Sequence, residues 1–182
     1  GRRLNESLGI VVHAQPFVPI DKLIVGRDGE CSFPSNFTVP LGRASDLVTA
    51  CDAFFAANRE EMERHGVTAT RLFLTFKGMF GLEPILYWHD RMNPLRASVL
   101  SDANRDKWGS RPAAEERRAY ALDLRRRMVA TLDRLAPMHF QTGKYYDYRG
   151  ALASAAEWSL VDGFKTMIDP GRIMNPGAMG LD

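Results

Sequence analysis

The chain has 182 residues, of which 45% are hydrophobic and 25% are charged. Its formal net charge of +2 is too small to indicate a nucleic-acid partner. No apolar run approaches the roughly 18 residues of a membrane span, and no apolar segment follows the charged start as it would in a secretory signal. Together with two cysteines that form no metal or disulfide pattern, these features predict a globular protein of the cytoplasm.

The N-terminal third predicts strands, a loop and a helix, in that order. Residues 8–25 are rich in β-branched side chains and are broken by prolines, which predicts two short strands. Residues 26–42 are rich in Gly and Pro and predict a long loop. A helix is expected from Ser45, a suitable N-cap, to His65, with Gly66 ending it. Its apolar positions recur at spacings of three and four, which predicts one buried stripe.

A hairpin and a second helix follow. Residues 71–76 and 83–88 predict its two strands, because glycines punctuate the short stretch between them. Residues 92–110 are polar and predict no regular structure. A helix is expected over 112–135, with an apolar core face. Its opposite face is basic, which predicts a solvated surface, with contact to an acidic partner as the alternative. That face carries Arg117, Arg118, Arg125, Arg126, Arg127 and Arg134.

The C-terminal part predicts a short strand with a loop at 138–148, a helix and a turn-rich tail. The helix is expected over 151–168, with Phe164 and Ile168 among the side chains that it buries. The tail from residue 169 onward is dense in Pro and Gly. The order of elements predicts an α+β fold. We expect an antiparallel sheet with helices on one face, of the ferredoxin-like kind, followed by a helical C-terminal tail.

The motifs of a self-contained active site are missing from the sequence. Neither glycine-rich phosphate motif occurs, and there is no H-E-x-x-H, C-x-x-C or G-x-S-x-G motif. The four histidines stand singly in the sequence. The chain is therefore not expected to form a complete active site by itself.

Two stretches concentrate side chains suited to a small anionic substrate. A strand over 83–91 places Tyr87 and His89 on one face, which suits His89 to act as a general base or as a donor to a substrate carboxylate. The alternative is a strand end with a surface pair of His89 and Asp90. Residues 139–146 combine amide and lysine donors with tyrosines, a mixture suited to holding a carboxylate, although the tyrosines could instead cap the core or face another domain. The candidate substrate-binding residues are Tyr87, Gln141, Lys144, Tyr145 and Tyr146, with Lys77 as a weaker candidate for the anion.

The closing stretch, KTMIDPGRIMNPGAMGL over 165–181, resembles the end of the FAD-linked oxidase C-terminal domain. In that family a helix ends in a lysine and is followed by Asp-Pro, a short apolar turn and Asn-Pro-Gly. The matching positions here are Lys165, Asp169 and Asn175. Upstream, Gly143–Lys144 ahead of the last helix resembles the family's glycine and basic residue. The prolines and glycines fix a tight path that holds a side chain such as Asn175 rigidly.

The resemblance implies a flavin enzyme of the glycolate oxidase and D-lactate dehydrogenase kind. Members bind FAD in an N-terminal domain with glycine-rich loops, a cap domain covers the substrate, and the tail returns to the flavin. The implied division is a cap over 1–135 and a segment over 136–182 that packs against the flavin domain, with Asn175 near the flavin. The implied reaction is oxidation of a small substrate, such as a 2-hydroxy acid, by hydride transfer to flavin N5.

The resemblance also implies that this chain is the substrate-side portion of such an enzyme and lacks the FAD-binding half. Alone it is expected to be inactive and to hold no FAD, because the phosphate-binding loops are missing. Its expected partners are a small-molecule substrate and the missing FAD-binding domain, with no nucleic acid and no membrane span, and a homo-oligomer is left open.

The sequence departs from the metal-dependent members of the family. Those members place Glu-His-Gly before the glycine and basic pair, and two histidines on an earlier strand. This sequence has His139-Phe140-Gln141 in the first place and only His89 in the second, so no metal site is expected. Two other function classes remain. One is a ferredoxin-like regulatory or protein-interaction module that uses its arginine-rich helix, and the other is a standalone enzyme that uses His89 and Asp90 without a cofactor.

Overall fold

The computed structural model describes residues 26–98, 100–139, 144, 146, 148–151 and 154–181, so the strands predicted within 8–25 lie outside the described residues. The strands are β1 (Cys31–Pro34), β2 (Phe37–Pro40), β3 (Val67–Phe76) and β4 (Met79–Trp88). The α-helices are α3 (Ala44–Ala57), α4 (Arg59–His65), α5 (Pro94–Ser98), α6 (Asp102–Trp108), α7 (Glu115–Leu132), α8 (Tyr148–Ala151) and α9 (Ala155–Ile168). Short 3-10 turns are η1 (Leu41–Arg43), η2 (Asp133–Leu135) and η3 (Ala178–Gly180).

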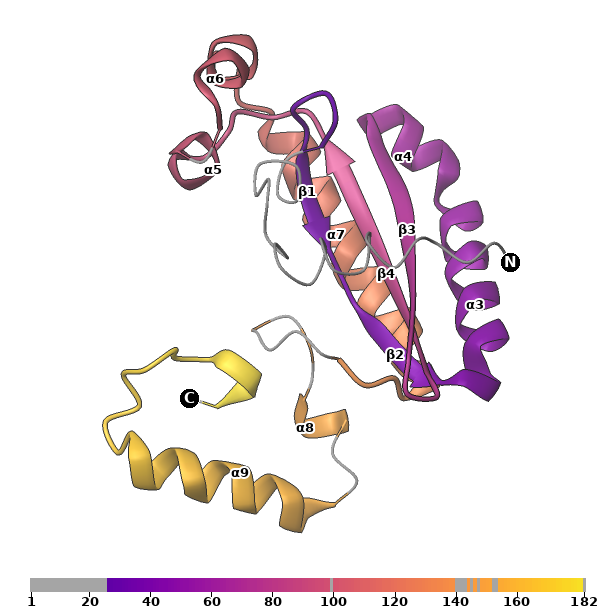
Figure 1. Ribbon diagram of the computed structural model, residues 1–182, viewed down its shortest axis with the longest axis vertical. Helices are drawn as coiled ribbons and strands as arrows, with labels where there is room; N and C mark the ends of the chain where they lie inside the picture. Colours follow the sequence, from indigo (N-terminus) through magenta and orange to yellow (C-terminus); the bar gives the residue numbers. More distant parts are fainter. Residues whose placement is uncertain are drawn as a thin grey trace, which may run out of the picture.

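The sheet is antiparallel and β4 is its central strand (Figure 1). The whole of β3 pairs with one edge of β4, and β1 and β2 pair in succession with the other edge. The predicted hairpin is thus confirmed and is longer than expected. Its turn is Lys77-Gly78, where both residues have positive φ (46° and 79°), the two-residue turn whose twist matches that of paired strands.

The strand order agrees with the predicted ferredoxin-like arrangement. β2 and β3 are joined through α3 and α4 and lie on opposite sides of β4, so they form a split β-α-β unit. After α7 the chain returns to the β2 edge, where Thr38 and Met138 form an isolated antiparallel bridge. The fourth strand of a β-α-β-β-α-β fold is therefore reduced to one bridge among the described residues.

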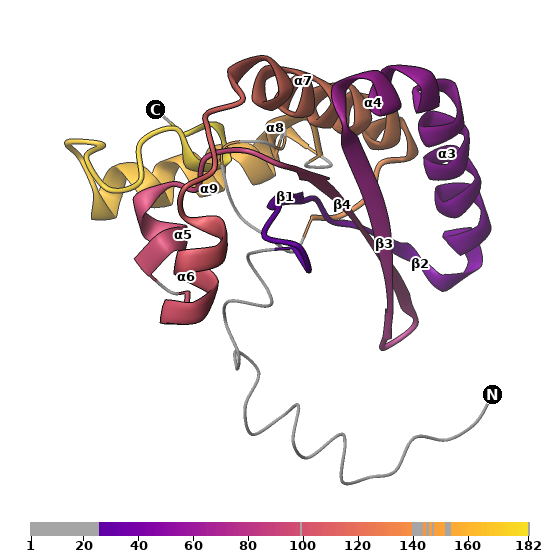
Figure 2. The same ribbon diagram turned by 90° about the horizontal axis from the view of Figure 1, so that it is seen from above.

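One face of the sheet is covered by α3, α4 and α7 (Figure 2). Phe37, Leu82 and Leu86 project from the strands, and Leu47 and Leu124 project from the helices, into a core where all five are fully buried. The opposite face has no covering helix in the part of the chain that the structure describes (Figure 2).

Three segments differ from the prediction. Residues 26–42 are not one loop, because they contain β1 and β2, two strands of four residues each. The Pro, Ser and Asn residues at the ends of these strands are typical of loops, so the strands were not predicted. The helix expected over 45–65 is broken at Asn58 into α3 and α4. Residues 92–110 hold α5 and α6, which pack around a small second core of Met92, Leu100 and Trp108.

The C-terminal helix α9 lies away from the sheet and its covering helices (Figure 1). The expectation that it buries its apolar face was wrong for the described residues, because Phe164 and Ile168 are 60% and 54% exposed. Ser154 caps its start, in a capping box with Glu157. Among the described residues, no helix combines the length and the apolar character needed to cross a bilayer.

Candidate functional site

The predicted pair Tyr87 and His89 lies at the end of β4. Tyr87 is half-buried on the face of the sheet opposite to α3, α4 and α7, and a Cβ placed at Gly26 would lie 3.0 Å from its ring. His89 follows directly after the strand and is exposed. Its Nδ1 lies 2.5 Å from Nη1 of Arg111, and its carbonyl oxygen accepts a hydrogen bond of 3.1 Å from Nη1 of Arg117.

Asp90 is buried and joins the end of β4 to the start of α7. Its carboxylate accepts from Nε of Arg118 at 2.6 Å, from the backbone N–H of Arg91 and Ala114 at 2.7 Å each, and weakly from the indole of Trp88 at 3.4 Å. Burial by itself raises the pKa of Asp90, but the hydrogen bonds outweigh it, above all that from Arg118, and lower the pKa to about 2. Asp90 is thus bound in the fold rather than paired with His89.

Two described residues of the second predicted stretch, His139 and Tyr146, pack against Asn36. Tyr146 is buried, and its Oη accepts hydrogen bonds from the backbone N and Nδ2 of Asn36 at 2.9 and 3.1 Å. His139 stacks on Tyr146 at 3.8 Å, and its ring nitrogens lie 2.5 Å from the carbonyl oxygen of Asn36 and 3.0 Å from Asp133. For Tyr146 these contacts agree with the alternative of a tyrosine that caps the core, and its role toward a substrate stays a prediction.

The remaining substrate-binding candidates are dispersed. Gln141 and Tyr145 lie outside the described residues. Lys144 is exposed and lines a cleft of about 600 Å³ beside α7, with Leu122 and Val129 among its apolar walls. Lys77 sits in the hairpin turn at the far end of the ten-residue β4, roughly 30 Å along the strand from His89. The structure therefore brings Tyr87 and His89 to one end of the sheet and leaves Lys77 at the other.

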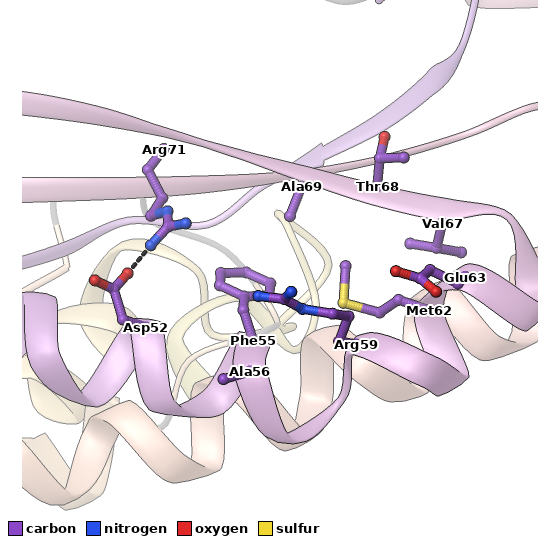
Figure 3. Close-up of a pocket in the computed structure, with 10 residues that line it drawn as sticks. All are labelled: Asp52, Phe55, Ala56, Arg59, Met62, Glu63, Val67, Thr68, Ala69 and Arg71. Carbon is purple, nitrogen blue, oxygen red and sulfur yellow. Dashed lines mark ion pairs between the residues drawn. The ribbon is translucent and has the colours of Figure 1, made fainter.

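A second cleft of about 530 Å³ lies between α3, α4 and the outer strand β3 (Figure 3). Phe55, Met62 and Val67 give it apolar walls, and Arg71 of β3 forms an ion pair with Asp52 of α3. None of the predicted site residues lines this cleft. Because its ion pair is satisfied within the fold, we assign no function to it.

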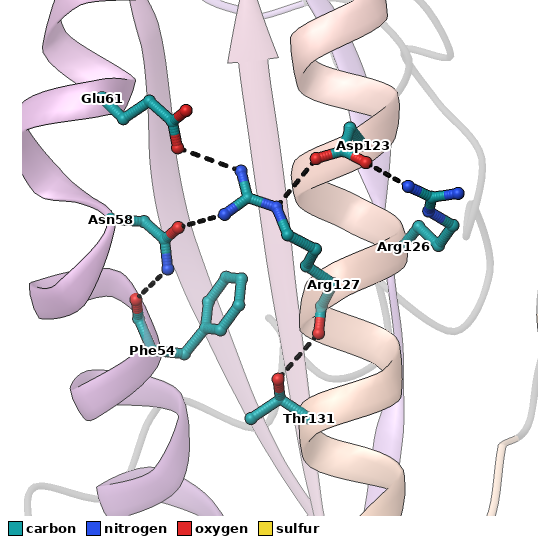
Figure 4. Close-up of polar contacts among 7 residues, drawn as sticks. All are labelled: Phe54, Asn58, Glu61, Asp123, Arg126, Arg127 and Thr131. Carbon is teal, nitrogen blue, oxygen red and sulfur yellow. Dashed lines mark hydrogen bonds and ion pairs between the residues drawn. The ribbon is translucent and has the colours of Figure 1, made fainter.

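The arginines of α7 are largely used inside the molecule. Arg127 donates to Asn58 Oδ1 at 2.6 Å, to Asp123 at 2.8 Å and to Glu61 at 3.1 Å, and thereby ties α7 to the break between α3 and α4 (Figure 4). Arg125 is only 7% exposed and donates to Ser35 Oγ at 3.0 Å. The prediction of a solvated basic face was therefore wrong for Arg125, because the polar groups between β1 and β2 require a buried donor.

The tail is held by one carboxylate. Asp169 is buried and accepts from Nζ of Lys165 at 2.5 Å and from the backbone N–H of Ile173 and Met174 at 3.1 and 3.0 Å. The hydrogen bond from Lys165 is the main cause that lowers the pKa of Asp169 below its ordinary value. Lys165 also donates to the carbonyl oxygen of Met174 at 2.6 Å. The lysine and aspartate of the closing motif therefore define the shape of the turn.

Asn175 occupies an exposed position with φ of 46°, a left-handed conformation that Asn tolerates better than most residues. Its carbonyl oxygen accepts a hydrogen bond from the backbone N–H of Ala178 at 3.1 Å. The side-chain amide stands on a hydrogen-bonded turn, and it can donate to and accept from a polar ring edge such as that of a flavin. The role near a flavin that the resemblance implies for Asn175 stays a prediction.

The outer surface of α9 and the turn after it is apolar. Leu160, Phe164, Met167 and Ile168 follow the spacing of one helical face, and Leu160 and Met167 are 75% and 70% exposed. Ile173 and Met174 extend this surface and are 81% and 55% exposed. We call these six residues the apolar stripe. A cluster of this kind marks a contact surface more often than isolated exposed residues do.

Two features of the site are not indicated by motifs or periodicity in the sequence. Arg111 lies in an irregular segment, and no pattern indicated its contact with His89. The exposure of the apolar stripe was missed because periodicity shows that a helix has an apolar face and does not show what covers it. Among the described residues, no group of three His, Cys, Asp or Glu side chains could hold a metal ion.

No protein-family model matches the chain, and a search of curated proteins finds no match.

Proposed function

We propose that the chain is the substrate-side portion of an FAD-dependent oxidoreductase that oxidises a small substrate such as a 2-hydroxy acid. The sheet is the cap over the substrate, and the C-terminal segment packs against an FAD-binding domain. Bound FAD would supply the hydride acceptor, while Tyr87 and His89 bind and orient the substrate. The cytoplasmic location predicted from the sequence belongs to the same proposal.

The apolar stripe on the preformed tail is the observation that carries this proposal. The buried carboxylate of Asp169 accepts three hydrogen bonds, one of them from Lys165, and these fix the turn before any partner binds. A surface that is already ordered in the free protein binds a partner without the entropic cost of becoming ordered on binding. Its exposed side chains are apolar, which suits a lasting contact with another domain better than contact with water.

The placement of Tyr87 and His89 gives independent support. Both lie at one end of β4, and Tyr87 projects from the face of the sheet opposite to the helices that cover the core. In the described part of the chain only one side of the sheet is covered by helices, and such a sheet can close over a second domain with its other side. A phenol and an imidazole at its end supply the few polar groups that orient a small ligand.

The test is the flavin content of two proteins, residues 1–182 alone and the complete protein that includes the FAD-binding domain. We expect the first to be colourless and the second to be yellow, with its flavin bleached under anaerobic conditions by members of a panel of 2-hydroxy acids. A complete protein without flavin would refute the proposal. Stoichiometric flavin on residues 1–182 would refute the claim that the main cofactor site lies elsewhere.

The alternative of an interaction module that uses the arginines of α7 has less support. Arg125 and Arg127 make the intramolecular contacts described above, and Arg118 is bound to Asp90. An acidic partner would have to compete with these contacts. The alternative of a standalone enzyme is weakened similarly, because Asp90 is buried and fully engaged, and so is not free to act with His89.

A further inference from the structure

The contact between Arg111 and His89 fixes where the imidazole carries its proton. Nη1 of Arg111 lies 2.5 Å from Nδ1 of His89. A guanidinium group can only donate hydrogen bonds, so Nδ1 must accept and must present its lone pair. A neutral imidazole carries one proton, and with Nδ1 accepting, that proton is on Nε2.

Arg111 is itself held in place by backbone contacts. Its Nη1 donates to the carbonyl oxygen of Gly29 at 2.8 Å, and its Nη2 donates to the carbonyl oxygen of Asp28. Gly29 has a φ of 76°, and the ring of Trp108 lies where its Cβ would be, so the loop is closely packed there. Nη1 of Arg117 donates to the backbone carbonyl oxygen of His89. The ring is therefore oriented by groups that have little freedom to move.

We propose that Arg111 is a positioning residue that holds His89 as the Nε2–H tautomer, so that His89 meets the substrate as a hydrogen-bond donor and not as the base. Nδ1 is blocked by Arg111, and Nε2 has no lone pair to offer in this tautomer. The group that it meets must be an acceptor, a carboxylate or carbonyl oxygen, and the positive charge of Arg111 favours a carboxylate. The identity of the ligand as a substrate rests on the proposed function, whereas the tautomer does not.

The experiment is long-range proton–nitrogen NMR on the full chain labelled with 15N-histidine. It is recorded at about pH 8.5, well above the ordinary imidazole pKa of about 6.5, so that the neutral rings are observed. His89→Gln assigns the signals of His89. We expect a protonated Nε2 and an unprotonated Nδ1. A protonated Nδ1, or a mixture of both tautomers, in the unmodified chain would overturn the proposal.

Arg111→Met removes the donors and keeps most of the side-chain length. We expect the Nδ1–H population of His89 to rise by about tenfold, the factor that a charge-assisted hydrogen bond gives. Arg126→Met is the matched control, because Arg126 pairs with Asp123 on the exposed side of α7, and it should leave His89 unchanged. The signals of His65 and His139 report whether each variant is folded.

Should Arg111→Met not fold, Arg111→Leu carries the test, because its side chain has no donor for Nδ1 and should raise the same population. A folded Arg111 variant with the unmodified tautomer pattern would overturn the proposal. The result is independent of the flavin assay. A colourless complete protein would remove the proposed function and leave the tautomer measurement standing, and a failed tautomer measurement would leave the flavin result standing.

Discussion

Asp90 and Arg125 are charged residues that help to hold α7 against the strands. Asp90 is 3% exposed and Arg125 is 7% exposed, and both connect α7 to the strands. From the sequence, a surface pair with His89 was the alternative interpretation of the first, and the second was predicted on a solvated face. Neither burial could be predicted, because the acceptors of Arg125 lie about 90 residues away along the chain, and only the folded sheet brings them together.

Asp90→Asn should destabilise the fold, because an amide cannot replace the charge-assisted bond to Arg118. We expect a loss of about 1 to 2 kcal/mol at neutral pH, allowing for solvent screening of the half-exposed guanidinium. Urea unfolding measures it. Asp102→Asn is the matched control, because its side chain is 93% exposed beside Arg105, and it should change stability by less than about 0.5 kcal/mol.

The effect of Asp90→Asn on the free energy of unfolding should depend on pH. The pKa of Asp90 is lowered from 3.8 to about 2 in the folded protein, so its contribution to stability is present above pH 3.8 and is lost as the pH falls toward 2. The difference between the unmodified chain and Asp90→Asn should therefore shrink over this interval. An equal difference at neutral pH and near pH 2 would contradict the assigned cause.

At the scale of elements, periodicity predicted the presence of helices better than it predicted whether their apolar faces are buried. The apolar face of α7 was predicted and packs on the sheet, with Leu124 and Leu132 fully buried. The apolar face of α9 has the same spacing but is exposed. Apolar spacing shows that a helix has an apolar face and does not show whether another element covers that face. β1 and β2 were missed because four residues beside prolines are too few to show alternation.

Leu160→Ala and Leu124→Ala make the contrast between these helices measurable. Leu160 is 75% exposed in α9, and we expect its truncation to change the free energy of unfolding by less than about 0.5 kcal/mol. Leu124 is fully buried in α7, and the same substitution should cost about 2 to 5 kcal/mol. Denaturant unfolding of both variants is the measurement. Equal losses would mean that α9 is packed within the chain.

Asp169→Asn should loosen the turn that follows α9. The amide retains acceptor capacity but loses the ion pair with Lys165, which is the main cause of the lowered pKa of Asp169. We expect faster cleavage within residues 170–181 by limited proteolysis, with unchanged circular dichroism. Asp106→Asn, an exposed change in α6, is the control and should leave the cleavage rate as it is. Equal rates for both variants would show that Asp169 does not order the tail.

At the scale of the whole molecule, the fold class was predicted correctly: an antiparallel sheet, helices packed against it and a helix near the C-terminal end. The hairpin of β3 and β4 was decisive for this prediction of the fold class, because strand-like alternation and glycines in the local sequence indicate it. The candidate site was predicted only in part, since Tyr87 and His89 lie together while Lys77 is distant. Contacts between loops, such as that of Arg111 with His89, depend on packing that no local pattern encodes.

The division into a cap over 1–135 and a C-terminal segment over 136–182 stays a prediction. The bridge between Thr38 and Met138 shows that the sheet includes at least one position beyond residue 135. The apolar stripe begins later, at Leu160. The surface that we propose faces the flavin domain is therefore α9 with the turn after it, whereas Met138 bridges to β2.

The most direct test of this account is the rate of anaerobic flavin reduction in the complete protein carrying Phe164→Asp and Met167→Asp in the apolar stripe. If the proposed FAD-binding domain holds the phosphates, we predict that flavin stays bound and that its reduction by a 2-hydroxy acid slows at least about tenfold, because two charges at the proposed contact, each costing on the order of several kcal/mol to bury, keep the C-terminal segment from packing against that domain. Leu95→Asp, at a leucine that is 74% exposed in α5, should leave the rate unchanged. Equal reduction rates in the stripe variant and the unmodified protein would contradict the account.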